Sequence, residues 1–312
     1  MKKYLITGGA GFIGSHITDA LLKSGLAVRV LDNFSSGRKT NLSEAISKIQ
    51  LFNADIRSKR ACLKATRGVD CVLHQAALRS VPKSFNNPIE YNEVNIQGTL
   101  NLLEAAVQNK VKTFVLASSS SIYGDVSDFP EKENFLPRPI SPYALTKLAG
   151  EHYCRIFSRQ YNLATISLRY FNVFGPRQSL DDEYAVVIPK FIDCMLRGKK
   201  PPIFGTGKQS RDFTFVANVV NANILASRQI KARGEVFNVA SGRDYSILDL
   251  VRILNKLTKS NLKPVLLAKR KGDVFRTLAD LSLIKGELGY KPKIDFIEGL
   301  KTTLEYFKCV RR

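Results

Sequence analysis

The stretch Thr7-Gly8-Gly9-Ala10-Gly11-Phe12-Ile13-Gly14 organises the first half of the chain. An apolar run precedes it, from which we expect a buried strand ending at Thr7, and apolar residues follow at helical spacing over 12–23. Glycines between a strand and a helix are typical of a dinucleotide site, because they permit a tight turn and a close approach of backbone to phosphate. We therefore predict that this turn cradles a pyrophosphate at the helix N-terminus.

An acidic residue supports this interpretation. Asp32 closes the next apolar run, 27–31, about twenty residues beyond the glycines, where a carboxylate can accept both ribose hydroxyls of an adenosine. The same carboxylate would repel a 2′-phosphate, so NAD is expected as the cofactor in preference to NADP. Arg38 and Lys39 keep NADP open, because a nearby base could accommodate that phosphate.

The composition indicates a globular chain with an unusually basic balance. Its 312 residues, 44% of them hydrophobic, are enough for one large or two modest domains. The formal charge of +21 is spread along the chain, and no recognition motif with interleaved aromatic residues accompanies it. We expect a solvated face that attracts anionic substrates, with no nucleic-acid partner.

The cysteines and the N-terminus bear on the cellular compartment. Five cysteines are scattered without a C-x-x-C motif, which argues against a disulfide framework or a metal site and fits the reducing cytoplasm. Lys2-Lys3 is followed by an apolar run too short for a signal peptide, and no apolar stretch is long enough for membrane insertion. We therefore expect a cytoplasmic protein.

Strands and helices alternate through the first half, which predicts an α/β fold with a doubly wound parallel sheet of Rossmann type. After residue 172 the alternation loosens, and we expect a smaller C-terminal substrate-binding domain over 173–312, with segments near 211–241 returning to the first domain, 1–172. Helices are expected over the segments 95–108, 185–197, 246–257 and from about 297 onward.

The segment Ser141–Lys147 carries the candidate chemistry. Pro142 fits a helix start, and Tyr143 and Lys147 then lie one turn apart on one helix face. A lysine ammonium beside a tyrosine favours the phenolate, as does a positive nicotinamide ring, and a phenolate can take a proton from a hydroxyl near neutral pH. Serines 118–121 end a predicted strand and bring hydroxyls to the edge of the sheet where ligands bind. His74, in contrast, is expected to be a packed core histidine.

With these motifs in place, the chain resembles the extended short-chain dehydrogenase/reductase superfamily and, within it, the NAD-dependent UDP-sugar 4-epimerases. The resemblance implies that Tyr143, Lys147 and Ser119 are catalytic and that the 4-hydroxyl of a UDP-sugar is oxidised by tightly bound NAD and reduced again on the other face. The residues that it places on the cofactor are Gly8, Gly11, Phe12, Ile13, Gly14, Asp32, Asn33, Asp55, Ile56, Gln75, Ala76, Ala77, Arg79, Asn95, Ser118, Tyr143, Lys147 and Tyr170.

The same resemblance implies a sugar-nucleotide site. Arg211 and Arg270 would pair with the pyrophosphate and Asp273 with the uridine ribose. All the residues that it places on the substrate are Ser80, Ser119, Ser120, Ser121, Tyr143, Asn172, Gln178, Val187, Ile188, Arg211, Arg270, Asp273 and Thr277. It also implies a homodimer in which helices at 95–109 and 141–161 form a shared bundle.

The branch of the family and the sugar depend on few residues. Related dehydratases and decarboxylases carry acids where this chain has Ser120 and Ser121, so the resemblance implies epimerisation alone. Gln178 and the small Thr277, at the pocket-gating position, favour UDP-GlcNAc/UDP-GalNAc, whereas Arg79 departs from the N-acetyl pattern. UDP-glucose/UDP-galactose and UDP-glucuronate stay open as substrates, and a non-catalytic NAD-binding regulatory protein is the alternative outside enzymes.

Overall fold

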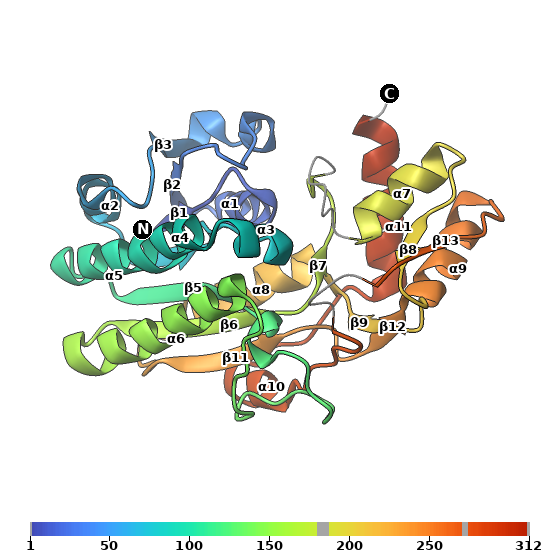
Figure 1. Ribbon diagram of the computed structural model, residues 1–312. Coiled ribbons are helices and arrows are strands. Elements are labelled where there is room, and N and C mark those ends of the chain that lie inside the picture. Colours follow the sequence, from blue (N-terminus) through green and yellow to red (C-terminus); the bar gives the residue numbers. More distant parts are fainter. Residues whose placement is uncertain (1, 180–186, 270–273, 311–312) are drawn as a thin grey trace.

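The computed structural model describes residues 2–179, 187–269 and 274–310, and its first lobe is built on a seven-stranded sheet (Figure 1). The strand order is β11-β6-β5-β4-β1-β2-β3, and every neighbouring pair is parallel. The order reverses between β1 and β4, so a crevice opens beyond the carboxyl ends of these strands. The strands are β1 (Lys3–Thr7), β2 (Ala27–Asp32), β3 (Ile49–Asn53), β4 (Cys71–His74), β5 (Thr113–Ser119), β6 (Ala164–Tyr170) and β11 (Glu235–Val239).

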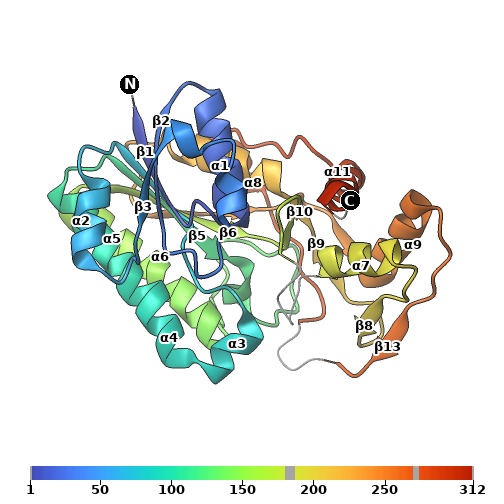
Figure 2. The same ribbon diagram turned by 90° about the horizontal axis from the view of Figure 1, so that it is seen from above.

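Helices cover both faces of this sheet (Figure 2). Tyr4 and Ile6 of β1 join a core with α1, α8 and α10, whereas Leu5 between them joins a second core with α2, α5 and α6, as the alternation of a strand requires. The helices of this lobe are α1 (Phe12–Lys23), α2 (Lys59–Thr66), α3 (Val81–Asn86), α4 (Pro88–Asn92), α5 (Gly98–Gln108), α6 (Pro142–Tyr161), α8 (Val216–Ala226) and α10 (Ser282–Leu288). Short turns of other helix types are η1 (Lys39–Leu42), η2 (Ile46–Lys48), η3 (Glu93–Gln97) and η4 (Ser120–Tyr123).

A second lobe has a core of its own, rich in aromatic rings. Phe213 stacks on Phe296 with 5.1 Å between ring centroids, and Phe174 packs edge-on against the same pair. Its helices are α7 (Val187–Leu196), α9 (Ile247–Thr258) and α11 (Phe296–Val310). Small two-stranded sheets complete it and connect it to the first lobe: β7 (Val173–Phe174) with β10 (Thr214–Phe215), β9 (Ser210–Asp212) with β12 (Asp244–Ser246), and β8 (Pro202–Phe204) with β13 (Val265–Leu267).

The predicted doubly wound parallel sheet is confirmed, and the differences lie in its details. The helix expected over 95–108 begins as a turn of π-helix, η3, and becomes α-helical at Gly98. The second half also returns to the sheet further along the chain than expected, because α10 packs against β11 after the segment 211–241. Among the residues that the structure describes, no helix is both long and apolar enough to cross a membrane.

Candidate active site

The glycine turn joins β1 to α1 at the switch point of the sheet. Gly8 has φ of 67°, and a Cβ there would lie 2.8 Å from the backbone nitrogen of Ala76 on the loop after β4. A Cβ on Gly14 would lie 2.2 Å from the Gly8 carbonyl oxygen. Only glycine therefore allows strand, turn and helix to approach this closely. The first residues of α1 line the crevice, and the first turn contains no acidic residue. Its N-terminus is therefore an attractive site for an anion.

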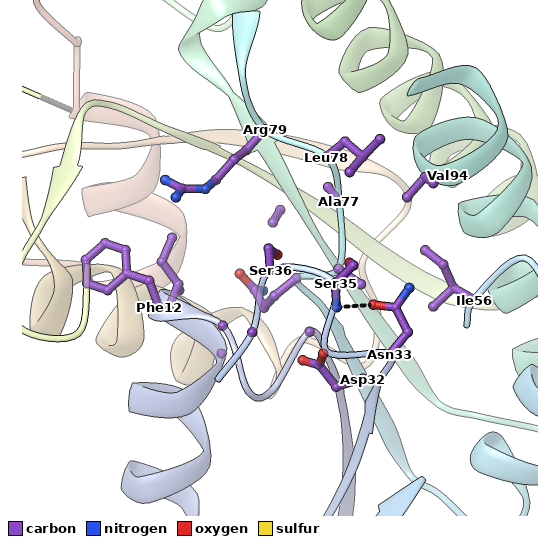
Figure 3. Close-up of a pocket in the computed structure, with 18 of the residues that line it drawn as sticks. Phe12, Asp32, Asn33, Ser35, Ser36, Ile56, Ala77, Leu78, Arg79 and Val94 are labelled. Atoms are coloured by element: carbon purple, nitrogen blue, oxygen red, sulfur yellow. Dashed lines mark hydrogen bonds between the residues drawn. The ribbon is translucent and has the colours of Figure 1, made fainter. Parts of the chain in front are cut away.

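Asp32 ends β2 beside this turn and lines the crevice (Figure 3). Its carboxylate accepts hydrogen bonds from the backbone N–H groups of Ala10 and Phe34, each over 2.8 Å. Burial raises the pKa of the Asp32 carboxyl, and the two backbone hydrogen bonds oppose that rise. The carboxylate has further acceptor positions for hydroxyl donors, which suits the ribose contact that the sequence predicts.

At the far end of this cavity, a small polar network surrounds the expected adenine position. Asn33 donates to Asp55 over 2.8 Å, and Arg57 donates to the same carboxylate. The hydrogen bond from Arg57 is the main reason that the pKa of Asp55 falls to about 2. Ile56 lines the cavity beside them, so an apolar side chain lies next to the charged Asp55 and Arg57.

The cofactor cavity includes nearly all of the predicted cofactor residues. Asn95 is the exception. Its side-chain amide accepts from the Leu78 N–H and donates to the Leu78 carbonyl and to the Thr146 hydroxyl. It therefore connects the loop after β4 to α6. The predicted residues that line the cavity are Gly8, Gly11, Phe12, Ile13, Gly14, Asp32, Asn33, Asp55, Ile56, Gln75, Ala76, Ala77, Arg79, Ser118, Tyr143, Lys147 and Tyr170.

Sequence reasoning missed part of this wall. Ser35 and Ser36 line the cavity from the loop after β2, and Leu78 and Val94 line it from the opposite side (Figure 3). The polar loop after Asp32 was visible in the sequence. The loop is held by hydrogen bonds from Arg38 and Asn41 to the Ala10 carbonyl, and local sequence patterns do not reveal these contacts.

The candidate catalytic side chains meet at the start of α6. Tyr143 is half-buried, and the Ser119 hydroxyl at the end of β5 lies near enough to the phenol to lower its pKa. Lys147 is buried one turn further on, donates to the Ala117 carbonyl oxygen over 2.8 Å and lies 5.9 Å from the centroid of the Tyr143 ring. The three side chains thus come together from β5 and α6, as the sequence predicts.

Burial and two neighbouring groups act on the pKa of Tyr143. Burial raises the pKa of the phenol, while the Ser119 hydrogen bond and the positive charge of Arg79 lower it. Burial also lowers the pKa of the Lys147 ammonium, to about 8. Ser119 and Arg79 therefore oppose the cost of burying a phenolate.

A second cavity adjoins the first, and Tyr143 lies where they meet. The residues that line both are Phe12, Ile13, Arg79, Ser118, Tyr143 and Tyr170. Figure 3 shows Arg79 reaching over the first cavity from the loop after β4. A ligand in the second cavity and a dinucleotide in the first would therefore face one another across the Tyr143 hydroxyl.

The second cavity includes most of the predicted substrate residues. Those that line it are Ser119, Ser120, Ser121, Tyr143, Asn172, Gln178, Val187, Arg211 and Thr277. Within the described part of the chain, Ser121 Oγ and Gln178 Oε1 are buried without a hydrogen-bond partner. Such atoms call for a polar ligand or water.

Four of the predicted substrate residues are not among those that line the second cavity. Ile188 is fully buried in the core of the second lobe and does not line either cavity. The Ser80 side chain caps α3 by accepting from the Lys83 N–H, and Ser80 does not line either cavity. Arg270 and Asp273 lie outside the described residues.

Two further predicted side chains, Arg211 and His74, are held by hydrogen bonds to neighbouring groups. Arg211 lines the second cavity, and its guanidinium donates to the backbone carbonyls of Val274 and Phe275. His74 is buried between the hydroxyls of Thr7 and Thr99, and burial lowers its pKa to about 3. The prediction that His74 is a core residue is confirmed.

Fold and site together define a dinucleotide-dependent enzyme of the extended short-chain dehydrogenase/reductase type. The sequence profile of the NAD dependent epimerase/dehydratase family matches residues 4–240, and the chain belongs to that family. NAD is its cofactor, and the glycine cradle, Asp32 and the open helix N-terminus fit that group.

Solved structures and curated relatives cover the whole chain. A UDP-glucose 4-epimerase from Thermotoga maritima is 39% identical, with a TM-score of 0.95 over 99% of this chain and 100% of that one. A UDP-N-acetylglucosamine 4-epimerase from Methanobrevibacter ruminantium is 40% identical, with a TM-score of 0.95 over 99% of each chain. A UDP-glucuronate 4-epimerase from Thermodesulfobacterium geofontis is 35% identical over 99% of this chain and 97% of its own length. The predicted resemblance is thereby confirmed.

Proposed function

We propose that this protein catalyses the C4 epimerisation of a UDP-hexose, and that its substrates are UDP-GlcNAc and UDP-GalNAc. One observation carries the proposed reaction: Tyr143, with Ser119 beside its phenol, stands where the cofactor cavity and the second cavity meet. A base between a dinucleotide and a sugar is what reversible oxidation of a sugar hydroxyl requires.

In the proposed mechanism Tyr143 removes the proton of the sugar 4-hydroxyl and later returns it. Ser119, beside the phenol, orients that hydroxyl, and Lys147 holds the end of β5 through the Ala117 carbonyl. NAD, when bound, supplies the hydride acceptor and donor for C4 and a positive charge near the phenol. The 4-keto sugar turns over within the second cavity before reduction, so net oxidation is zero.

The serine turn after β5 favours epimerisation over related chemistry. Elimination or loss of a carboxyl group needs a further acid or base beside the sugar. Ser120 and Ser121 occupy the positions where the related dehydratases and decarboxylases carry acids, and both line the second cavity. Hydroxyls cannot take over that proton transfer at neutral pH. Chemistry is therefore expected to stop at C4.

Two residues support an N-acetylated sugar. The buried Gln178 Oε1 lacks a donor among the described residues, and an acetamido N–H is a suitable one. Thr277 is small and lines the same cavity, which leaves room beside the sugar. The similar Methanobrevibacter enzyme is named for this substrate.

UDP-glucuronate is the second candidate, because a cation lies at the junction of the cavities. Arg79 is exposed and lines both. A guanidinium at this place would suit a carboxylate on the sugar. The Thermodesulfobacterium relative is named for that substrate.

An equilibrium assay tests these proposals. The purified protein, with no NAD added, is incubated separately with UDP-GlcNAc, UDP-glucose and UDP-glucuronate, and the products are separated by chromatography. We expect a C4 epimer from UDP-GlcNAc, which would also show that NAD remains bound through purification. An epimer only from another sugar would overturn the substrate but not the reaction. No product from any of them, even with NAD added, would favour a non-catalytic NAD-binding protein.

We further propose that the protein is a homodimer with the outer faces of α5 and α6 at its interface. Large apolar side chains are exposed on this side of the lobe: Leu145 (56%) and Ile156 (50%) on α6, and Ile89 (74%) on α4. Exposed apolar side chains that gather on one side often mark a protein–protein interface. Light scattering after size exclusion should give twice the chain mass of 34.8 kDa. Leu145→Asp should reduce it to that of one chain.

We also propose that the protein works in a reducing compartment such as the cytoplasm. All five cysteines are free thiols, and four of them are buried. Burial raises the pKa values of the Cys62, Cys71 and Cys154 thiols to about 12, which keeps them unreactive. Fractionation of the source cells would place the protein directly.

A further inference from the structure

Asn172 lies in the wall of the second cavity in an unusual conformation. It follows β6, and its φ of 35° is in a region that few residues other than glycine adopt. The Thr214 N–H donates to its carbonyl oxygen over 3.2 Å, which holds the backbone in this turn. Asparagine tolerates such a turn better than most residues, yet a turn alone does not require its amide to have any given orientation.

The orientation of the amide is set by its partners. Asn172 Nδ2 donates to Thr277 Oγ1 over 2.9 Å and to the Asp212 backbone carbonyl over 3.3 Å. A backbone carbonyl can only accept, so the nitrogen of the amide must be on this side. The oxygen, Oδ1, is then on the other side and has no hydrogen-bond donor among the described residues, in a side chain that lines the cavity.

Thr277 is itself held firmly in place. Its backbone N–H donates to the Ser210 carbonyl over 3.2 Å, and its carbonyl accepts from the Asp212 N–H over 3.0 Å, so the segment runs alongside β9. The side chain is 7% exposed. The hydroxyl therefore presents a fixed acceptor to Asn172, from a residue 105 positions further along the chain.

We propose that Thr277 is a positioning residue, whose hydroxyl fixes the Asn172 amide so that Oδ1 faces the sugar nucleotide as a hydrogen-bond acceptor. This inference rests on the proposed function, since it takes a UDP-sugar as the ligand of the second cavity. A hexose offers hydroxyl donors, and an acetamido group offers an N–H, to such an acceptor. If residue 277 only left space for the sugar, any small side chain would serve. The positioning role needs a side-chain oxygen at residue 277 to accept from the Asn172 amide.

Two substitutions separate space from hydrogen bonding. Thr277→Val keeps the volume and removes the acceptor, and Thr277→Ser keeps the acceptor and removes a methyl group. NAD-loaded wild-type and variant proteins are titrated calorimetrically with UDP-GlcNAc, UDP-glucose and UDP-glucuronate, and the tightest ligand is used for the comparison. Steady-state kcat and KM are measured with the same ligand.

We expect Thr277→Val to weaken binding and raise KM by roughly 10-fold, about 1.4 kcal/mol, with a much smaller change in kcat. Thr277→Ser should stay within about 2-fold of the wild type, because it rescues the hydrogen bond. In an Asn172→Ala background, Thr277→Val should have no further effect, since the group that it positions is gone. A merely structural role would not give this pattern of rescue and dependence on Asn172.

The proposal is overturned if Thr277→Val binds as the wild type does, if Thr277→Ser is as impaired as Thr277→Val, or if the effect of Thr277→Val persists without the Asn172 amide. The binding measurement needs no turnover. Ligand binding by the wild type without any C4 epimer would therefore contradict the proposed function, while the comparison of variants would still decide the role of Thr277.

Discussion

The buried ion pair beneath the serine turn gives a sharp prediction about stability. Glu151 of α6 and Arg169 of β6 are each 4% exposed and form two hydrogen bonds, of 2.8 Å and 3.0 Å. Glu151 also accepts from the Ser118 hydroxyl, next to Ser119 in the serine turn. Glu151→Gln keeps the shape of the side chain but leaves the guanidinium of Arg169 buried opposite a neutral amide.

Loss of one partner of a buried ion pair typically costs about 3–5 kcal/mol, because the remaining charge stays out of water without compensation. For a chain of this size we expect a fall in melting temperature on the order of 10 °C. The matched control is Glu104→Gln. Its pair with Lys59 has a similar N···O distance, 3.1 Å, but its partners are 46% and 65% exposed, so the loss should be under about 1 kcal/mol.

Thermal unfolding followed by circular dichroism, with saturating NAD present throughout, measures both variants. Replacement of both buried partners, as in Glu151→Leu with Arg169→Met, should recover part of the loss, because no unpaired charge remains. If Glu151→Gln and Glu104→Gln lowered the melting temperature equally, burial would not be the property that makes the inner pair important, and the reasoning would be refuted.

Three further predictions concern the site and its surroundings. Tyr143→Phe should lower kcat at least about 100-fold, because the proton acceptor is lost, while NAD absorbance in the purified protein stays unchanged; substantial turnover would contradict its role as the base. Thr277→Tyr should cost UDP-GlcNAc turnover far more than UDP-glucose turnover, and equal losses would show that residue 277 does not gate the cavity. Burial and the negative charge of Asp212 raise the pKa of Glu131 to about 8, so the folded state keeps this carboxyl neutral and the wild type should lose stability as pH rises from about 4.5 to 8. Glu131→Gln should flatten that decline in melting temperature, and parallel curves would contradict it.

The sequence predicted the parts of the site that depend on local pattern. The glycine turn, Asp32 and the Tyr143–Lys147 pair are short motifs whose geometry follows from one strand or one helix, and the structure places them at one crevice. The helix that begins at Pro142 shows why: the Ser141 side chain caps it by accepting from the Ala144 N–H, a signal contained within four residues.

What the sequence could not predict depends on contacts between distant segments. The sequence does not show that the Asn95 amide binds Leu78 and Thr146, neither of which is near it in the chain. Val187 lines the second cavity, whereas the next residue, Ile188, is buried in the core. Consecutive residues of a helix point in different directions, so the two side chains have different surroundings. No local pattern distinguishes these outcomes, because each is decided by which element packs alongside.

The pKa of Tyr143 also depends on contacts between distant segments. Burial alone disfavours its phenolate, and the groups that oppose burial come from other strands: Ser119 from the end of β5 and Arg79 from the loop after β4. These strands are neighbours in the sheet, and parallel pairing brings their carboxyl ends to one edge. A helix with the same Tyr143–Lys147 spacing in another fold would have neither group beside the phenol. For Tyr143 as the proposed base, the pH profile of Arg79→Met should shift to higher pH than that of the wild type, because the variant lacks a positive charge that lowers the pKa of the phenol. An unshifted profile would contradict this influence of Arg79.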